Sequence, residues 1–233
     1  MTKTTPTGLT NYLLTNTLAN KLLFTTVILA IFFVPLIPVK FHSAAYNIVF
    51  TSILIFGTQL ISTKRMLSLL YVLVAISMVW IADALALDGV KAISKWINVL
   101  LFMFIVYDLV KQVSMAREIS LKVILEAVNA YLMIGLAFSL MVALTMYFNH
   151  GSYNLNNLNY LTDQHESPLQ HCVYYAFITM TTTGYGDIVP IAPLSRSLAI
   201  FISVTGQLYV AIVIALLIGK YISQQGHTGN TEK

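Results

Sequence analysis

The sequence predicts an all-α membrane protein with six transmembrane helices and a shorter re-entrant helix and loop between the fifth and the sixth. Two observations lead to this prediction. The 233 residues are 58% hydrophobic and only 9% charged, and so few charges could not cover the surface of a soluble domain. The apolar residues also fall in runs of about 20, the length that a helix needs to cross a bilayer.

The first expected span, residues 22–39, follows a polar segment, residues 1–21, that we expect on the cytoplasmic side. Pro35 and Pro38 predict that this helix kinks or ends near them. A cleaved signal peptide is the alternative, although the apolar run is longer than a typical signal core. Three further runs of the same kind follow, at residues 44–62, 66–87 and 96–113.

The fifth and the last expected spans, residues 123–148 and 194–221, enclose a shorter apolar segment. A polar loop, residues 149–168, leads into that segment, residues 169–181. As a helix it would be about 20 Å long, too short to cross the bilayer. We therefore predict a re-entrant helix, because the non-helical backbone after it is tolerated only where protein and water surround it.

The basic residues are distributed unevenly about these spans. With the N-terminus inside, nine of the 13 Lys and Arg side chains fall on the cytoplasmic side and four fall outside. This asymmetry predicts a multi-pass protein of the cell membrane with both termini in the cytoplasm. Since placement explains the basic residues, the net charge of +4 gives no reason to expect a nucleic-acid partner.

No catalytic chemistry is indicated. The single cysteine, Cys172, excludes an internal disulfide and a multi-cysteine metal site. The sequence has no nucleophile–base constellation, no phosphate-cradling motif and no cluster of metal ligands. We therefore expect neither an enzyme nor a bound cofactor.

The most informative stretch is TTGYGD, residues 182–187. A dehydrated cation needs oxygens in place of its water, and a row of backbone carbonyls supplies them if successive C=O groups aim at one axis. An ordinary strand alternates these directions. The backbone must therefore alternate between right- and left-handed conformations, and glycine reaches the left-handed one at little cost. Gly184 and Gly186 meet this need, and Thr182 can add a hydroxyl oxygen.

This stretch resembles the selectivity filter of the potassium-channel superfamily. Thr183 stands where the commonest filter has valine, and Tyr185 stands where related non-selective cation channels tend to have an acidic residue. Residues 119–223 resemble the two-helix pore domain of bacterial potassium channels, with residues 174–180 similar to its pore helix and residues 206–212 to its inner helix. The resemblance implies a passive potassium channel, a homotetramer in the lipid bilayer. Its filter would bind K⁺ at Thr182, Thr183, Gly184 and Tyr185, with Gly186 completing the row.

The same resemblance implies roles around the filter. Asp187 would lie at the outer mouth, and Tyr174 and Tyr175 would pack behind Tyr185. Related channels often carry a glutamate at the position of Ile178, so a pair of carboxyl groups that supports the filter is not expected here. Gly206 would be a hinge of the inner helix, with close helix packing as the alternative. The side chains facing the cavity would be Gln207, Val210, Ile214 and Ile218, and a ring of the last would close the pore by excluding water.

Residues 22–118 are expected to form a four-helix transmembrane domain in front of the pore. A voltage sensor needs several basic residues in one helix, because each charge that crosses 100 mV gains only about 2.3 kcal/mol. The fourth expected span carries only Lys111, and none of the three arginines lies in the middle of a span. We therefore expect no steep voltage sensing. Residues 224–233 would be a short cytoplasmic tail.

Several polar residues are candidates for function but also have local explanations. Asp83 and Asp108 lie within apolar runs, where acidic residues are functional candidates by default. We favour an interfacial position for Asp83 and a local pair of Asp108 with Lys111. Glu126, four residues after Lys122, is expected to pair with it on the helix surface. Three histidines of the outer loop could sense pH, although a solvated loop is the simpler interpretation: His150, His165 and His171.

Other functions stay open at this point. One is a non-conducting or regulatory channel subunit, and another is a weakly selective cation channel. A potassium transporter built on this architecture would need four related pore loops in one chain, and the sequence contains one.

Overall fold

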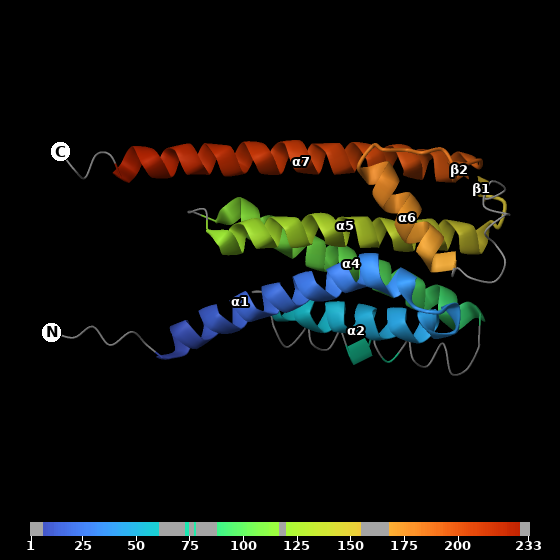
Figure 1. The fold of residues 1–233 in the computed structure, drawn as a ribbon, viewed down its shortest axis with the longest axis horizontal. Helices are drawn as coiled ribbons and strands as arrows, with labels where there is room; N and C mark the ends of the chain where they lie inside the picture. Colours follow the sequence, from blue (N-terminus) through green and yellow to red (C-terminus); the bar gives the residue numbers. More distant parts are fainter. Residues whose placement is uncertain are drawn as a thin grey trace.

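The structure is a computed structural model of the chain that describes residues 7–60, 73–74, 77, 88–116, 120–154 and 168–228. The long helices run side by side as a bundle (Figure 1). In chain order the elements are α1 (Thr7–Ile28), the π-turn η1 (Leu29–Phe33), the 3₁₀ turns η2 (Val34–Leu36) and η3 (Val39–Phe41), α2 (His42–Leu60), α4 (Asp88–Met115), α5 (Leu121–Phe148), β1 (Tyr153–Asn154), α6 (Pro168–Met180), β2 (Val189–Pro190) and α7 (Pro193–Thr228).

Helix α5 occupies the middle of the bundle. It packs against α1 and α4 on one side and against α6 and α7 on the other. Helix α7 lies along one edge, and the short α6 lies obliquely between α5 and α7 (Figure 1). Helix α1 begins and α7 ends at the same end of the bundle. The side of the membrane on which that end lies stays a prediction.

The expected spans agree with the structure in part. Three helical stretches of the described residues are long and apolar enough to cross a membrane, namely Thr17–Leu36, Leu121–Phe148 and Pro193–Ile222. They correspond to the first, fifth and last expected spans, so this is a membrane protein with several candidate spans. The apolar part of α2, Ala44–Leu60, is shorter. The third expected span, residues 66–87, lies outside the described residues except at 73–74 and 77.

The start and end of the first span differ from a simple helix. Helix α1 begins at Thr7, well inside the segment that the sequence predicts to precede the span. The helix gives way at Leu29 to the π-turn η1 and then to the 3₁₀ turn η2, which contains Pro35. A proline removes one backbone donor and clashes with the preceding turn. The prediction that the helix ends near Pro35 and Pro38 is therefore confirmed.

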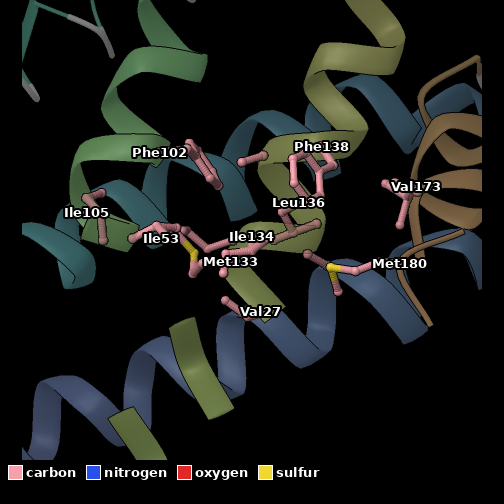
Figure 2. Packing of buried hydrophobic residues seen from close by; sticks show 14 of the residues in the cluster. Val27, Ile53, Phe102, Ile105, Met133, Ile134, Leu136, Phe138, Val173 and Met180 are labelled. Carbon is pink, nitrogen blue, oxygen red and sulfur yellow. The ribbon is translucent and has the colours of Figure 1, made fainter. Parts of the chain in front are cut away.

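One apolar core joins α1, α2 and α4, here called the front helices, to α5 and α6. Val27, Ile53 and Phe102 come from the front helices, and Met133, Phe138 and Met180 come from α5 and α6 (Figure 2). Each of these six side chains is at most 1% exposed. The core is therefore continuous across residue 118, which the sequence predicts to be the boundary between the front region and the pore region.

A two-stranded antiparallel sheet brings distant parts of the loop region together. Tyr153 in β1 is paired with Pro190 in β2, and Asn154 is paired with Val189. The carbonyl of Ser152 accepts hydrogen bonds from the N–H of Ile191 at 2.8 Å and from the Ser195 hydroxyl at 2.7 Å. Because β1 follows α5 and β2 precedes α7, the chain between them enters and leaves at the same end of α5.

Candidate functional site

The candidate site is the loop of residues 181–187, here called the filter loop, together with the helix α6 that carries it. Helix α6 is 13 residues long, as expected for a segment too short to cross the bilayer. Its side chains Cys172, Val173, Ala176 and Met180 are buried in the core. With β1 and β2 paired, the chain through α6 and the filter loop begins and ends at the same end of α5, and its re-entrant position in the membrane stays a prediction.

The backbone of the filter loop alternates in handedness. Thr182 has φ 60°, Gly184 has φ 51° and Gly186 has φ 80°, while Thr183 and Tyr185 are not in this region. Every second residue is therefore left-handed, which is the condition for successive carbonyls to share one side. The glycines were predicted from their spacing. Threonine rarely adopts the left-handed conformation, so residue type alone does not predict left-handed backbone at Thr182.

Open space, not close packing, surrounds the two filter glycines. A Cβ atom added to Gly184 or Gly186 would meet no atom within 4 Å. Residues 181–186 are all exposed in the single chain, and Tyr185 is 72% exposed. In the single chain, it is therefore the left-handed backbone and not close packing that favours glycine at 184 and 186.

Backbone N–H groups tie the filter loop to the end of α6. The N–H groups of Thr183 and Gly184 donate to the carbonyl of Ile178 at 2.9 and 3.2 Å, and the N–H of Thr182 donates to the carbonyl of Thr179 at 3.0 Å. These bonds satisfy carbonyls of the last helical turn, which have no partner within the helix. Within the loop, the Thr182 hydroxyl donates to the Thr181 carbonyl at 2.6 Å, so the candidate ligands are the carbonyls that follow, at residues 182–185.

The end of the filter loop that is farther along the chain from α6 is fixed by Asp187. The Tyr174 hydroxyl donates to Asp187 Oδ2 at 2.5 Å, and the N–H of Ile188 donates to Asp187 Oδ1 at 3.0 Å. Tyr175 points elsewhere, since it is buried and makes an edge contact with Tyr153 at 5.1 Å between ring centroids. The structure thus connects Tyr174 to the loop and places Tyr175 between α6 and β1.

Two glycines allow α5 and α7 to approach α6 closely. A Cβ on Gly206 of α7 would lie 2.3 Å from the carbonyl oxygen of Met180, and one on Gly135 of α5 would lie 2.4 Å from the ring of Phe177. Helix α7 continues through Gly206 to Thr228 without a break. The geometry supports the close-packing interpretation of Gly206, and the hinge stays a prediction.

Helix α7 has a packed side and an exposed side. Ile202, Gly206 and Tyr209 face the rest of the chain, and the Tyr209 hydroxyl donates to the carbonyl of Ala127 at 2.7 Å. The four residues expected to face a cavity are instead exposed in the single chain: Gln207, Val210, Ile214 and Ile218. Their exposure leaves this side free for other copies of the chain, for water or for lipid.

The other acidic candidates have polar partners. Asp108 is 6% exposed, and its carboxylate accepts a hydrogen bond from Gln112 Nε2 at 2.9 Å. The predicted ion pair of Asp108 with Lys111 is wrong, because no ion pair joins these two described residues. One helical turn brings the Gln112 amide to the carboxylate instead. Glu126 pairs with Lys122 at 3.6 Å, as predicted, but it is 3% exposed and so does not lie on the helix surface. It also accepts from Asn20 Nδ2 at 3.0 Å.

Two of the three candidate histidines, His150 and His171, lie among the described residues. His150 is exposed and His171 is half-buried, whereas His165 and Asp83 lie outside the described residues. In the part of the chain that the structure describes, no group of three or more His, Cys, Asp or Glu side chains is placed to hold a metal ion.

Sequence reasoning missed the polar contacts between distant helices. Asn129 of α5 donates to the carbonyl of Asn20 of α1 at 3.0 Å, and Lys220 of α7 donates to carbonyls at the end of α4. The partners are 106 or more positions apart, so no local pattern in the sequence relates them.

The fold and the loop define a membrane-embedded pore element: a short buried helix, a carbonyl-bearing loop and two long flanking helices. A protein-family model described as "Ion channel" matches residues 134–223, which include most of α5, all of α6, the filter loop and most of α7. This part of the chain is therefore an ion-channel pore domain, not an enzyme. No curated protein and no solved structure matches the chain.

Proposed function

We propose that the protein is a passive potassium-selective channel of the cell membrane, with four copies of the chain around one conducting axis. The alternating backbone at Thr182, Gly184 and Gly186 is the observation that supports this proposal most. It permits a row of carbonyl oxygens, and the bonds from the loop N–H groups to α6 hold that row in place. In this proposal K⁺ is coordinated by Thr182, Thr183, Gly184 and Tyr185.

The need for four copies follows from coordination. One strand of backbone offers oxygens on one side only, whereas a dehydrated ion needs them all round. The exposed filter loop and the exposed side of α7 are the surfaces that three further copies would cover.

Fast conduction through such a filter follows from repulsion between the ions in it. Two K⁺ ions two residues apart, about 6.6 Å, repel by roughly 2.5 kcal/mol at an effective dielectric constant of 20.

The surroundings of the filter have proposed roles as well. Helix dipoles place partial negative charge at the C-terminal end of α6, near the inner end of the filter loop. Asp187 would make the outer mouth attractive to cations. Gln207, Val210, Ile214 and Ile218 would line an inner cavity, and the Ile218 ring would close it. Both termini would lie in the cytoplasm.

The test is ion uptake by liposomes that contain the purified protein alone. The proposal predicts uptake of K⁺ well above uptake of Na⁺. Equal uptake of both ions would favour a weakly selective cation channel, and no uptake by the folded protein would favour a non-conducting subunit.

A matched pair of variants assigns the flux to the filter. Gly186→Ala places a Cβ on a residue with φ 80° and should abolish uptake. Gly151→Ala, in the turn between α5 and β1, where an added Cβ would make only an ordinary contact at 3.6 Å, should leave uptake unchanged. Equal uptake by the two variants would contradict the proposed site.

A further inference from the structure

The C-terminal part of α7 is held to the end of α4 by one side chain. Lys220 Nζ lies 2.9 Å from the carbonyl oxygen of Val113 and 2.9 Å from that of Ser114. Helix α4 ends at Met115, so both carbonyls belong to its last turn and lack a partner within the helix. A lysine ammonium satisfies such carbonyls and also interacts favourably with the helix dipole.

Lys220 lies on the packed side of α7. Tyr209, Val213 and Leu217 precede it at helical spacing, and the last two pack against a small cluster formed by Val113, Val123 and Ala127. The exposed side of the same helix carries Ile214 and Ile218. The hydrogen bonds from Lys220 to α4 therefore hold the end of α7 against its own chain. They act on the side of the helix opposite to Ile214 and Ile218.

Packing between α4 and α7 is otherwise incomplete in this region. A cavity of about 110 Å³ separates them. Its walls are mostly apolar, and seven residues line it: Val110, Val113, Ser114, Tyr209, Ile212, Val213 and Leu216. Since unfilled space forfeits van der Waals contacts, packing between α4 and α7 is weakened here, and the two hydrogen bonds of Lys220 join the two helices beside the cavity.

We infer that Lys220 is a positioning residue that holds the pore in its open form by anchoring the end of α7 to α4. The inference rests on the proposed channel function. Closure by the Ile218 ring requires the ends of four α7 helices to approach one axis. Each Lys220 opposes that movement by attaching its own helix to the front helices of its own chain, so the front helices influence the gate without carrying voltage-sensing arginines.

Single-channel recording of three variants tests the inference. Lys220→Met keeps the aliphatic stem but loses the donors, and should lower the open probability about tenfold, as expected for the loss of charged hydrogen bonds. Lys220→Arg keeps charged donors and should restore most of the open probability. Lys111→Met removes an equal charge from the exposed part of α4 and should behave as the wild type. Unitary conductance and K⁺ selectivity should stay unchanged in all three, because the filter is untouched.

An open probability of Lys220→Met within twofold of the wild type would overturn the inference. So would a fall in unitary conductance or selectivity with no change in open probability, since that indicates a structural effect on the filter.

A second measurement does not depend on conduction. Val113→Cys and Val213→Cys, in a Cys172→Ala background, place thiols on the α4 and α7 walls of the cavity between these helices, where a short thiol cross-linker would join them. Adding Lys220→Met should slow cross-linking severalfold, whereas Lys220→Arg should not. An unchanged rate would refute the anchor even if the wild type conducts. Absence of conduction with a slowed rate would instead refute the proposed channel function and leave the anchor supported.

Discussion

Helices α5 and α7 have similar hydropathy and opposite surroundings. Their apolar stretches have mean hydropathies of 2.0 and 2.3, but 67% of the α5 stretch is buried within the chain against 11% of the α7 stretch. Hydropathy alone places both in the membrane. Burial distinguishes what each contacts, since α5 is covered by its own chain and α7 presents a long apolar side to lipid or to other copies. This difference supports a pore formed by several chains.

The largest expected difference in stability is between alanine variants of two phenylalanines whose rings are in contact. Phe138 of α5 is 1% exposed, Phe201 of α7 is 51% exposed, and their rings meet edge to face at 5.7 Å between centroids. Phe138→Ala should lower the free energy of unfolding by about 3–5 kcal/mol, because it leaves a cavity. Phe201→Ala should cost the single chain about 1 kcal/mol. Denaturant titration of both variants in detergent measures the difference, and equal losses would contradict the contrast between the two helices.

A second prediction concerns the one place where α7 is tightly packed. Gly206→Ala would put a methyl group against the Met180 carbonyl, and since backbone atoms cannot yield easily, we expect a loss of about 1–3 kcal/mol. Gly219→Ala is the control on the same helix, and it should be neutral or slightly stabilising. Thermal unfolding of both variants checks this. A Gly206→Ala protein with unchanged stability and lost opening would instead support a hinge.

A third prediction tests the outer anchor of the filter loop. Tyr174→Phe removes the hydrogen bond to Asp187 Oδ2 and should cost at most about 1 kcal/mol of stability, since the site is partly exposed. The carbonyl row is then less firmly held, so the ratio of K⁺ to Na⁺ permeability should fall severalfold. Tyr107→Phe, on the exposed part of α4, should leave that ratio unchanged. An unchanged ratio in Tyr174→Phe would show that the anchor does not serve selectivity.

The smallest expected effect on stability is on the exposed side of α7. Ile214 is 51% exposed, so Ile214→Ala should change the free energy of unfolding of the chain by less than about 0.5 kcal/mol. Leu136 of α5 is fully buried, so Leu136→Ala should cost about 2–5 kcal/mol. If Ile214 lines the cavity, its variant should alter the unitary conductance while stability stays constant. A large loss of stability would place Ile214 in an interface instead.

Local patterns in the sequence predicted the features that depend on local chemistry. The spacing of Gly184 and Gly186 predicted left-handed backbone at both positions, and the short apolar run before them predicted α6. Pro35 predicted the end of the first helix. Each of these follows from the conformational limits of one residue type, so no knowledge of distant contacts is needed.

Features that depend on contacts between distant residues could not be predicted in this way. The left-handed backbone of Thr182 and the Tyr174–Asp187 bond arise from how the loop is held against α6. The Lys220 anchor joins residues 106 or more positions apart. Asp108 was expected to pair with Lys111 because of charge, whereas the amide of Gln112 reaches the carboxylate across one helical turn. In each case geometry, not residue type, selects the partner.

The most direct test of the account is a crystal structure of the assembled protein with Tl⁺ in place of K⁺. The account predicts a row of anomalous density peaks on an axis shared by four chains, bounded by residues 182–185 of each. A single chain without partners, or four chains whose Gly184 and Gly186 face away from their common axis, would contradict it.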